Sequence, residues 1–452
     1  MSVDALATGD DLATLLSGRA EAPAGPAAAQ PPWLKELRAQ ALERVGALKL
    51  PSSRDEAWRF TGVSALAQQS FHPAAAPAAL QPADVARFCL DEAALRLVFV
   101  DGVHAPALSC TGVAGAAGAG VVDGAGAGVF IGTLAAALAA QPELVRAHLG
   151  RHAAFHDHPF AALNTAFLHD AAVVLVPRGR SVATPVHLLF IAGEAGVASH
   201  PRILVVGEPG SSVTLIEDYV ALHDGSGFTD PVAEIVIGAG AAIEHVRIQR
   251  ESEAAFHIAS CAVSLAHASR YRSVSVALGA RLSRLDLDVR QSAEAAECTL
   301  AGLALIGGRQ LADTHSCIDH LQRNGTSRQL HKCIVDGAAH AVFNGRVIVR
   351  PGAQQTDSAQ SSRNLLLTRT AVVDTLPQLE ILADDVKCAH GATVGQLDSE
   401  EVFYLRSRGL SEEAARDLLT YAFGAEVIER IPVASLRAKL ERAVLERTAR
   451  RP

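Results

Sequence analysis

Aromatic residues are scarce in this 452-residue sequence, at 4%, although hydrophobic residues make up 49% and charged residues 19%. The two larger proportions are typical of a globular chain and exclude wholesale disorder. Because large rings are few and glycines number 36, the core must be built from small and branched aliphatic side chains, which suit short stacked strands. The length allows a large core and normally implies more than one domain.

An excess of positive charge is also missing, since the net charge is −8 and the pI is about 6.1. Proteins defined by nucleic-acid binding usually carry a basic stripe, so we expect no nucleic-acid partner. We expect no membrane contact either, because the longest small-apolar stretch, residues 114–140, is interrupted by Asp123 and by many glycines. The first 30 residues lack a basic start followed by an apolar run, which argues against a secretory signal.

Cysteine pairs of the CxxC type are absent. The cysteines are odd in number and scattered, which argues against a disulfide framework and against a self-contained zinc site. We therefore expect a reducing compartment and a cytoplasmic protein. The seven cysteines are Cys89, Cys110, Cys261, Cys298, Cys317, Cys333 and Cys388.

The motifs of several common catalytic sites are missing as well. None of the five lysines follows a glycine, so the chain has no phosphate-binding loop of the ATPase type. It also has no GxGxxG after a strand, no GxSxG and no HExxH, and each of these chemistries depends on the backbone geometry of its motif. We expect a chain that is not itself an enzyme.

The residue pattern changes three times along the chain. A proline- and alanine-rich stretch near the start suggests a flexible lead-in, and helical spacing follows it. A long succession of strand-like runs comes next, and the chain becomes helical again at a capping-box-like pair formed by Asp398 and Glu401. The predicted divisions are the lead-in at 1–32, a mostly helical region at 33–170, a core of strands at 171–397 and a helical domain at 398–452.

Many strand-like runs of the core begin just after a small-residue corner, as at residues 210–212, 240–242 and 279–280. No ten-residue helical pattern separates these runs, so a layered α/β sheet is disfavoured. Repeated short strands with small corners favour a solenoid in which each coil stacks on the next. The repeat is irregular, and a β-sandwich stays open as the alternative.

Two interpretations of the C-terminal helices also stay open: they form a cap that closes the stack, or they form a docking surface for another protein.

The clearest candidate for chemistry is the pair formed by Cys388 and His390. Residues two apart on a strand project from the same face, and a thiolate with an imidazole makes a soft ligand pair for iron. Two ligands cannot complete a cluster site, which commonly takes four, so another subunit must supply the rest. The alternative, which spacing alone favours, is a buried cysteine beside a hydrogen-bonded histidine.

A second group of histidines and cysteines lies on two nearby strand-like runs. His315 and Cys317 would share one strand face, His331 and Cys333 would share another, and His320 lies between the two pairs. Metal binding is one interpretation. Polar stacking inside a solenoid is the interpretation we favour.

A distinctive set of motifs extends almost unbroken from about residue 313 to residue 431, with weaker matches at residues 54–59 and 160–185. It comprises Ser327–Lys332, Val342–Val347, Gln360–Leu367, Asp374–Glu380, Ala383–Asp398 and Phe403–Gly409. Together these motifs resemble the SufB/SufD family of iron–sulfur cluster assembly scaffold proteins. The segment at 54–59, the pattern around Cys388 and the lack of cysteine-rich segments favour the SufD branch of that family.

The resemblance implies a mainly β fold: a right-handed parallel β-helix core with a helical N-terminal region and a C-terminal helical domain. It also implies a SufB-like partner that pairs through the β-helix and a SufC-like ATPase that docks on the C-terminal helices. The docking residues that it implies are Phe403, Tyr404, Leu405, Arg406, Arg408 and Tyr421.

By this resemblance the chain is a non-catalytic scaffold subunit of the SUF complex. A nascent iron–sulfur cluster would form at the interface with the SufB-like partner, with His390 and Cys388 among its ligands. The chain alone would hold no cofactor stably. The resemblance leaves open whether a flavin joins the complex and whether the isolated chain forms homodimers. The rival hypotheses are a purely structural partner that supplies no ligand and a free-standing metalloenzyme.

Overall fold

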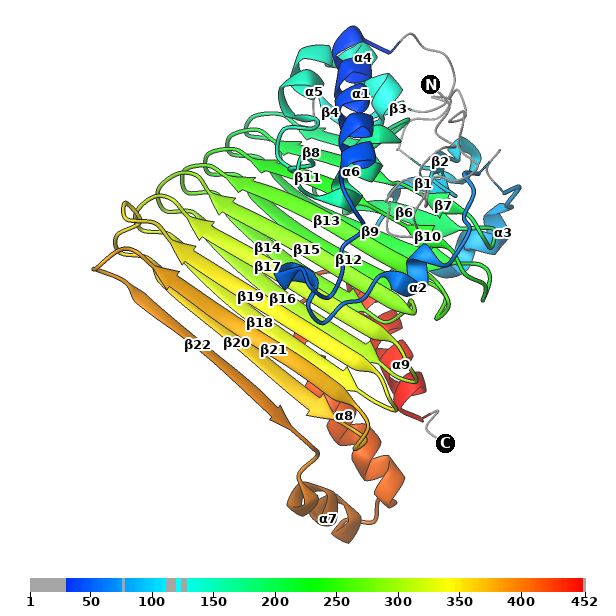
Figure 1. Cartoon of the computed structure of the whole chain (residues 1–452), viewed down its shortest axis with the longest axis vertical. Helices are drawn as coiled ribbons and strands as arrows, with labels where there is room; N and C mark the ends of the chain where they lie inside the picture. The colour runs from blue at the N-terminus through cyan, green and yellow to red at the C-terminus, as the bar shows by residue number, and fades with distance from the viewer. Residues whose placement is uncertain (1–29, 75–77, 111–118, 123–127, 450–452) are drawn as a thin grey trace.

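The protein folds around a parallel β-helix of about eight turns, with helices toward both ends of the chain (Figure 1). The computed structural model describes residues 30–74, 78–110, 119–122 and 128–449, so the predicted lead-in lies outside the described residues except for its last three. The predicted fold class is confirmed, and the β-sandwich alternative is wrong.

Two long sheets form opposite walls of the β-helix. In spatial order the ten-stranded sheet contains β2 (Val103–His104), β1 (Leu95–Val100), β6 (Val186–Ala192), β9 (Ser212–Ala221), β12 (Ala242–Arg250), β14 (Arg270–Ala277), β16 (Glu297–Ile306), β18 (Thr326–Val335), β20 (Asp357–Leu366) and β22 (Lys387–Gly395). The twelve-stranded sheet contains β21 (Val372–Ile381), β19 (His340–Val349), β17 (Leu311–His320), β15 (Leu282–Gln291), β13 (Phe256–Leu265), β11 (Val232–Ile237), β8 (Arg202–Gly207), β5 (Ala172–Val176), β4 (Val129–Thr133) and β3 (Ala119–Val122), with the short β7 (Ala198–Ser199) and β10 (Phe228–Thr229) beside this path.

The strands of successive coils pair in parallel and in register, so equivalent side chains form columns along the stack. Alternate residues of each strand face the interior. In the early coils the interior includes fully buried aliphatic side chains such as Leu188, Leu215 and Ile235. In the later coils it also includes buried hydroxyl side chains such as Ser327 and Ser362.

One corner of the coil is built from residues with a left-handed backbone. Gly210 and Gly240 have φ values of 72° and 64° there, and their N–H groups donate to the carbonyl oxygens of the next coil. The equivalent position in later coils is taken by Ala268, Ala295 and Asn324, all with positive φ. The corner therefore repeats in space while its glycine does not repeat in sequence.

Helices lie along the outer faces of both sheets and at one projecting tip of the molecule (Figure 1). They are α1 (Pro32–Ala47), α2 (Ser64–Ala67), α3 (Pro82–Val85), α4 (Leu134–Ala140), α5 (Pro142–His148), α6 (Pro159–Ala166), α7 (Ser399–Ser407), α8 (Glu412–Ile428) and α9 (Ala434–Ala449), with the short 3₁₀ turns η2 (Glu56–Trp58), η3 (Ala86–Phe88) and η4 (Pro106–Leu108). Leu34 of α1 and Val145 of α5 pack with Leu204 on the twelve-stranded sheet. Ile428 of α8 and Leu440 of α9 belong to the apolar cluster on the outer face of the ten-stranded sheet.

The two ends of the β-helix differ. At the N-terminal end the parallel stacking stops at antiparallel pairs, β1 with β2 and β4 with both β3 and β5. At the other end β21 and β22 each pair on one side only, within the part of the chain that the structure describes. Val372, Leu382 and Val394 are 47%, 58% and 50% exposed at this open end. Among the described helices, none has the length and apolar character needed to cross a bilayer.

Candidate functional site

Cys388 and His390 both lie on β22, the last strand of the ten-stranded sheet, at the open end. Cys388 is aligned with Ser358 of the coil beneath it, and His390 is aligned with Gln360. Because Ser358 and Gln360 are both buried in the interior, the two candidate ligands continue interior-facing columns. The prediction that they share a strand face is confirmed, while ligand binding stays a prediction.

The exposure of the pair is set by its place in the last coil. His390 is exposed, and Cys388 is half-buried against the apolar cluster of Val347, Val349 and Leu379. Burial raises the pKa of the Cys388 thiol, although a backbone hydrogen bond from Ser358 opposes this shift. The exposed position of His390 makes the pair accessible, and the alternative of a buried cysteine beside a hydrogen-bonded histidine stays open.

Several other cysteines are unsuitable for chemistry because they are enclosed. Cys261, Cys298 and Cys333 are buried, and burial raises the pKa of Cys333 to about 12 and raises those of Cys261 and Cys298 further. Thiols with pKa values this high are protonated at neutral pH and are poor ligands or nucleophiles. Cys388 differs from them in lying at a surface where another molecule can reach it.

A polar ladder lies beneath each candidate ligand. Beneath Cys388, the Oγ atoms of Ser358 and Ser327 are 2.7 Å apart, and Ser327 Oγ is 3.0 Å from Nε2 of His320. Beneath His390, Gln360 Nε2 donates to Gln329 Oε1 at 2.8 Å, and Gln329 Nε2 donates to Ser316 Oγ of the opposite sheet at 2.7 Å. The interior behind the site thus combines these hydrogen bonds with the apolar cluster that Cys388 contacts.

The second histidine and cysteine group divides between the two sides of the walls. His331 and Cys333 of β18 are both enclosed in the interior, where Cys333 belongs to an apolar cluster, so polar stacking stays a prediction. His315 and Cys317 alternate with Ser316, which bonds Gln329 inside, so they lie on the outer face of β17. The described residues contain no group of three or more His, Cys, Asp or Glu side chains that could hold a metal ion.

Sequence reasoning missed a charged network buried between the sheets. Glu217 pairs with Nε2 of His245 at 3.0 Å and accepts a hydrogen bond from Tyr219 at 3.1 Å. Arg247 contacts His257, whose Nδ1 is 2.6 Å from Glu251.

Burial opposes the charge on Glu217, but His245 and Arg247 outweigh this effect and hold the pKa of Glu217 below its usual value. Register could have revealed the network, because Glu217 and Arg247 occupy adjacent positions of one column.

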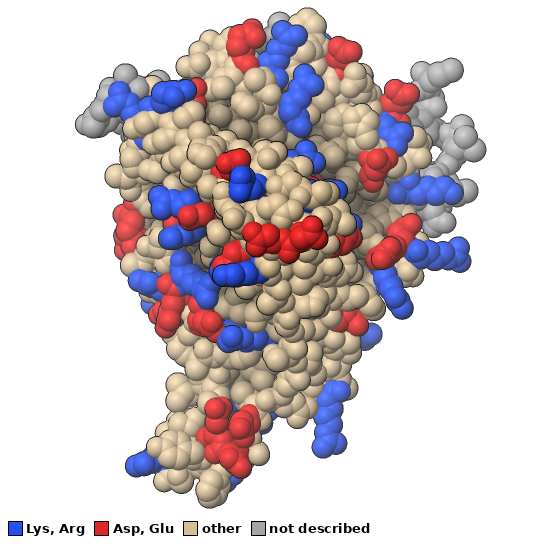
Figure 2. All heavy atoms as spheres, turned by 90° about the vertical axis from the view of Figure 1, so that its left-hand side faces the viewer, with Lys and Arg blue, Asp and Glu red and all other residues tan. Residues whose placement is uncertain are grey.

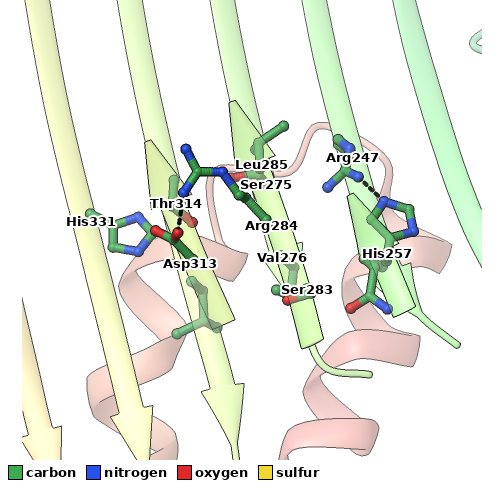
Figure 3. A pocket seen from close by; sticks show the side chains of 13 residues that line it. Arg247, His257, Ser275, Val276, Ser283, Arg284, Leu285, Asp313, Thr314 and His331 are labelled. Atoms are coloured by element: carbon green, nitrogen blue, oxygen red, sulfur yellow. Dashed lines mark hydrogen bonds and ion pairs between the residues drawn. The ribbon is translucent and has the colours of Figure 1, made fainter. Parts of the chain in front are cut away.

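A small cavity separates this network from His331 (Figure 3). Its volume is about 20 Å³, on a measure by which one water needs roughly 10–15 Å³. Arg247, Ser275 and His331 line it, and they lie in one column with Gly302, against which the His331 ring packs. The cavity is large enough for a water molecule and too small for a substrate or cofactor.

The six residues predicted for ATPase docking lie on α7, at its C-terminal boundary and on α8. Phe403 and Tyr404 are 72% and 56% exposed, Arg406 and Arg408 are exposed, and Leu405 is half-buried. Tyr421 is half-buried because it packs against the apolar cluster beneath α8 and α9. Figure 2 shows a group of acidic side chains on the projecting tip where Figure 1 places α7. Glu400 and Glu401 of α7 and Glu412 and Glu413 of α8 are exposed.

Comparison with protein families matches almost all of the β-helix. Residues 190–423 match the family described as "SUF system FeS cluster assembly, SufBD core domain", and residues 118–188 match "SufBD protein N-terminal region". The chain belongs to the SufB/SufD family. The match to the core domain includes the open end, where Cys388 and His390 lie, and it extends into the C-terminal helices.

Within the SufB/SufD family the chain is SufD-like. It is 40% identical over 426 residues to an iron–sulfur cluster assembly SufBD family protein of Synechocystis, covering 92% of this chain and 91% of that protein. It is 33% identical over 396 residues to the iron–sulfur cluster assembly protein SufD of Escherichia coli, covering 87% of each. It is also 38% identical over 288 residues to the chloroplastic protein ABCI7 of Arabidopsis thaliana, covering 62% of this chain and 60% of that protein.

Proposed function

We propose that this chain is the SufD-like scaffold subunit of a SUF complex and has no catalytic activity of its own. Its open β-helix end pairs with a SufB-like subunit, and its C-terminal helices dock a SufC-like ATPase. A nascent iron–sulfur cluster forms at the shared interface, where His390, joined by Cys388, supplies ligands from this side. The chain works in the cytoplasm, and it retains no cofactor once it is separated from its partners.

The position of Cys388 and His390 carries this proposal. The two side chains stand at the end of the β-helix where the parallel strands β21 and β22 have unpaired outer edges, within the described residues. Unpaired strand edges are the usual place for another chain to add. Two soft ligands at such an edge fit an incomplete metal site that a second subunit completes. From Cys388 to Gly395, β22 carries no charged side chain that would oppose the approach of a partner.

The tip formed by α7 and the start of α8 supports the docking role. Phe403 and Tyr404 together expose an unusual amount of aromatic surface for a chain with so few rings. Aromatic and arginine side chains are enriched at the centres of protein interfaces, and Arg406 and Arg408 flank this pair. In this proposal α8 and α9 cover the sheet, and α7, which extends beyond it, is the docking surface.

Helix α8 is also joined to the strands that lie behind the candidate site. Lys332 of β18 donates to the carbonyl oxygen of Phe423 at 2.8 Å and contacts Glu426 of α8. Arg363 of β20 pairs with the same Glu426 at 3.3 Å. These strands carry Gln329 and Gln360 on their inner faces. A movement of α8 driven by an ATPase on the tip would therefore reach the coils beneath His390.

The test is a comparison of His390→Ala with His156→Ala in a reconstituted three-subunit complex. His156 is a matched control because it is an exposed histidine in the N-terminal region, far from β22 in the sequence. We expect the His390 variant to assemble normally and to yield roughly tenfold less cluster, as expected for loss of a metal contact. Cluster content is measured by iron and sulfide analysis after gel filtration of the complex.

The same experiment separates the proposal from its main rival. If the complex stayed intact and the cluster yield stayed full when His390 or Cys388 was replaced by Ala, this chain would be a purely structural partner that supplies no ligand. Tight iron binding by the isolated wild-type chain would instead favour a free-standing metalloprotein.

A further inference from the structure

Gln360 is the side chain directly beneath His390, and one of its polar atoms lacks a partner. Its Nε2 donates to Gln329 Oε1 at 2.8 Å, while its Oε1 has no hydrogen-bond partner among the described residues. Gln360 is only 4% exposed. A buried acceptor left unsatisfied is costly, so a native site normally supplies a donor for it.

The surrounding residues hold the Gln360 carboxamide in one place. Gln329 is itself fixed by donating to Ser316 of the opposite sheet, so the Gln360 amide group is anchored on the side of the coil beneath. On the opposite wall, a Cβ on Gly345 would lie 2.3 Å from Gln360 Nε2. Gly345 therefore leaves the room into which the Gln360 amide extends. Because Nε2 is turned toward Gln329, Oε1 is turned away from that residue.

The residue of the next coil that is in register with Gln360 is His390. Neighbouring strands lie about 4.8 Å apart, which is within reach of a rotated imidazole above a glutamine. A metal-binding histidine commonly donates its second ring N–H to a fixed acceptor, which sets the tautomer and the ring orientation.

We propose that Gln360 is a positioning residue for His390: its Oε1 accepts the ring N–H of His390 and leaves the other ring nitrogen free for iron. The ligand class is a metal that binds neutral imidazole. This inference rests on the proposed function for the role of His390, but the hydrogen bond itself belongs to the chain alone.

The first test measures the tautomer of His390 in the isolated full-length chain at pH 8 by ¹⁵N NMR of histidine-labelled protein. The His390 signals are assigned by their absence in His390→Ala. We expect one dominant tautomer in the wild-type chain and in Gln360→Glu, which keeps the acceptor. We expect a mixture of both tautomers in Gln360→Met, which has a similar size and no acceptor.

A second variant tests the same hydrogen bond without replacing Gln360, so the test does not depend on the folding of Gln360→Met. Gly345→Ala keeps the chemistry of Gln360 but pushes its amide group away from the opposite wall, and we expect it to produce the same tautomer mixture. An unchanged tautomer ratio in both Gln360→Met and Gly345→Ala would overturn the inference.

The third measurement is cluster yield in the reconstituted complex. We expect Gln360→Met to lower the yield about tenfold, in line with loss of a hydrogen bond to a metal ligand, and Gln360→Glu to restore it. If His390→Ala lowers the yield and Gln360→Met leaves both yield and tautomer unchanged, only the positioning role fails. If His390→Ala has no effect on yield while the tautomer follows Gln360, the proposed function fails and the hydrogen bond stands.

Discussion

The imidazole of His331 lies flat against the ring of Phe343, with centroids 4.4 Å apart and planes inclined by 10°. The two residues come from opposite sheets, β18 and β19, so their contact spans the interior of the β-helix. The position is tightly enclosed, because Gly302 in the neighbouring coil lies directly against the His331 ring. This stacked pair fixes the interior about two coils before the open end.

Gly302→Ala is expected to destabilise the protein by about 1–3 kcal/mol, because the new methyl group would overpack the interior. Its Cβ would lie 2.3 Å from His331 Nδ1. The control is Gly395→Ala on β22, where a Cβ meets nothing within 4 Å and the substitution should be neutral or slightly stabilising. Denaturant unfolding of the isolated chain measures both, and equal stabilities would mean that the His331 ring moves aside freely.

The stability of the isolated chain is expected to fall as the pH is lowered from 6.5 toward 4. Burial lowers the pKa values of His320 and His331 to about 4, whereas each ring has a pKa near 6.5 in the unfolded chain. In this window the unfolded state binds more protons than the native state, so stability is complete above pH 6.5 and declines below it.

Removing one of these rings should reduce that pH dependence. We expect His331→Leu to lose about 2 kcal/mol less stability than the wild type between pH 7 and pH 5. His156→Leu, at an exposed position, should leave the dependence unchanged. Unfolding free energies at the two pH values give the comparison, and parallel losses in all three proteins would contradict a neutral buried His331.

Glu234→Gln is expected to cost about 3–5 kcal/mol, because it would leave the fully buried Arg202 without its counter-charge. Glu234 is 2.6 Å from Arg202, and it also accepts N–H groups from residues 150–153. The matched control is Glu380→Gln, since Glu380 pairs with Arg346 at the same 2.6 Å but both side chains are 46% exposed. That surface pair should contribute no more than about 1 kcal/mol, and similar losses in the two variants would refute the role of burial.

The double variant Phe403→Ala/Tyr404→Ala is expected to weaken ATPase binding by about 2 kcal/mol or more, since exposed aromatic pairs often dominate an interface. A deletion of all residues after 398 is less informative, because Val427, Leu436 and Val444 are buried against the ten-stranded sheet and their loss would expose its core. Leu42→Ala on α1, 53% exposed, is the control. Calorimetric titration with the ATPase measures the affinity, and an unchanged affinity would place docking elsewhere.

Much of this architecture could be predicted from the sequence because its signals are local. Helix α1 follows the apolar spacing that begins at Trp33, and Ser411 caps α8 through a hydrogen bond to Ala414. The strand segment after residue 171 was also predicted, because β-branched runs and small corners recur without helical spacing. The same-face placement of Cys388 and His390 needed only the two-residue period of a strand.

The columns could not be predicted, since they depend on the number of residues in each coil. Gln360 comes into register with Gln329 and His390 only when the chain has turned through the corners that separate the three strands. The corners are poorly marked in the sequence, because Gln355 before β20, like Ala268 and Ala295 in earlier coils, adopts a positive φ without glycine. The buried pair of Glu217 and Arg247 was missed for the same reason, as two charges 30 residues apart give no local sign of contact.

The unlike ends of the β-helix limit how many copies can join. Antiparallel strands finish the N-terminal end, and only β21 and β22 offer edges that continue the parallel stack within the described residues. When another chain pairs with these edges, the parallel stack has no second parallel edge on which to continue. The asymmetry therefore disfavours open-ended stacking of copies through the β-helix.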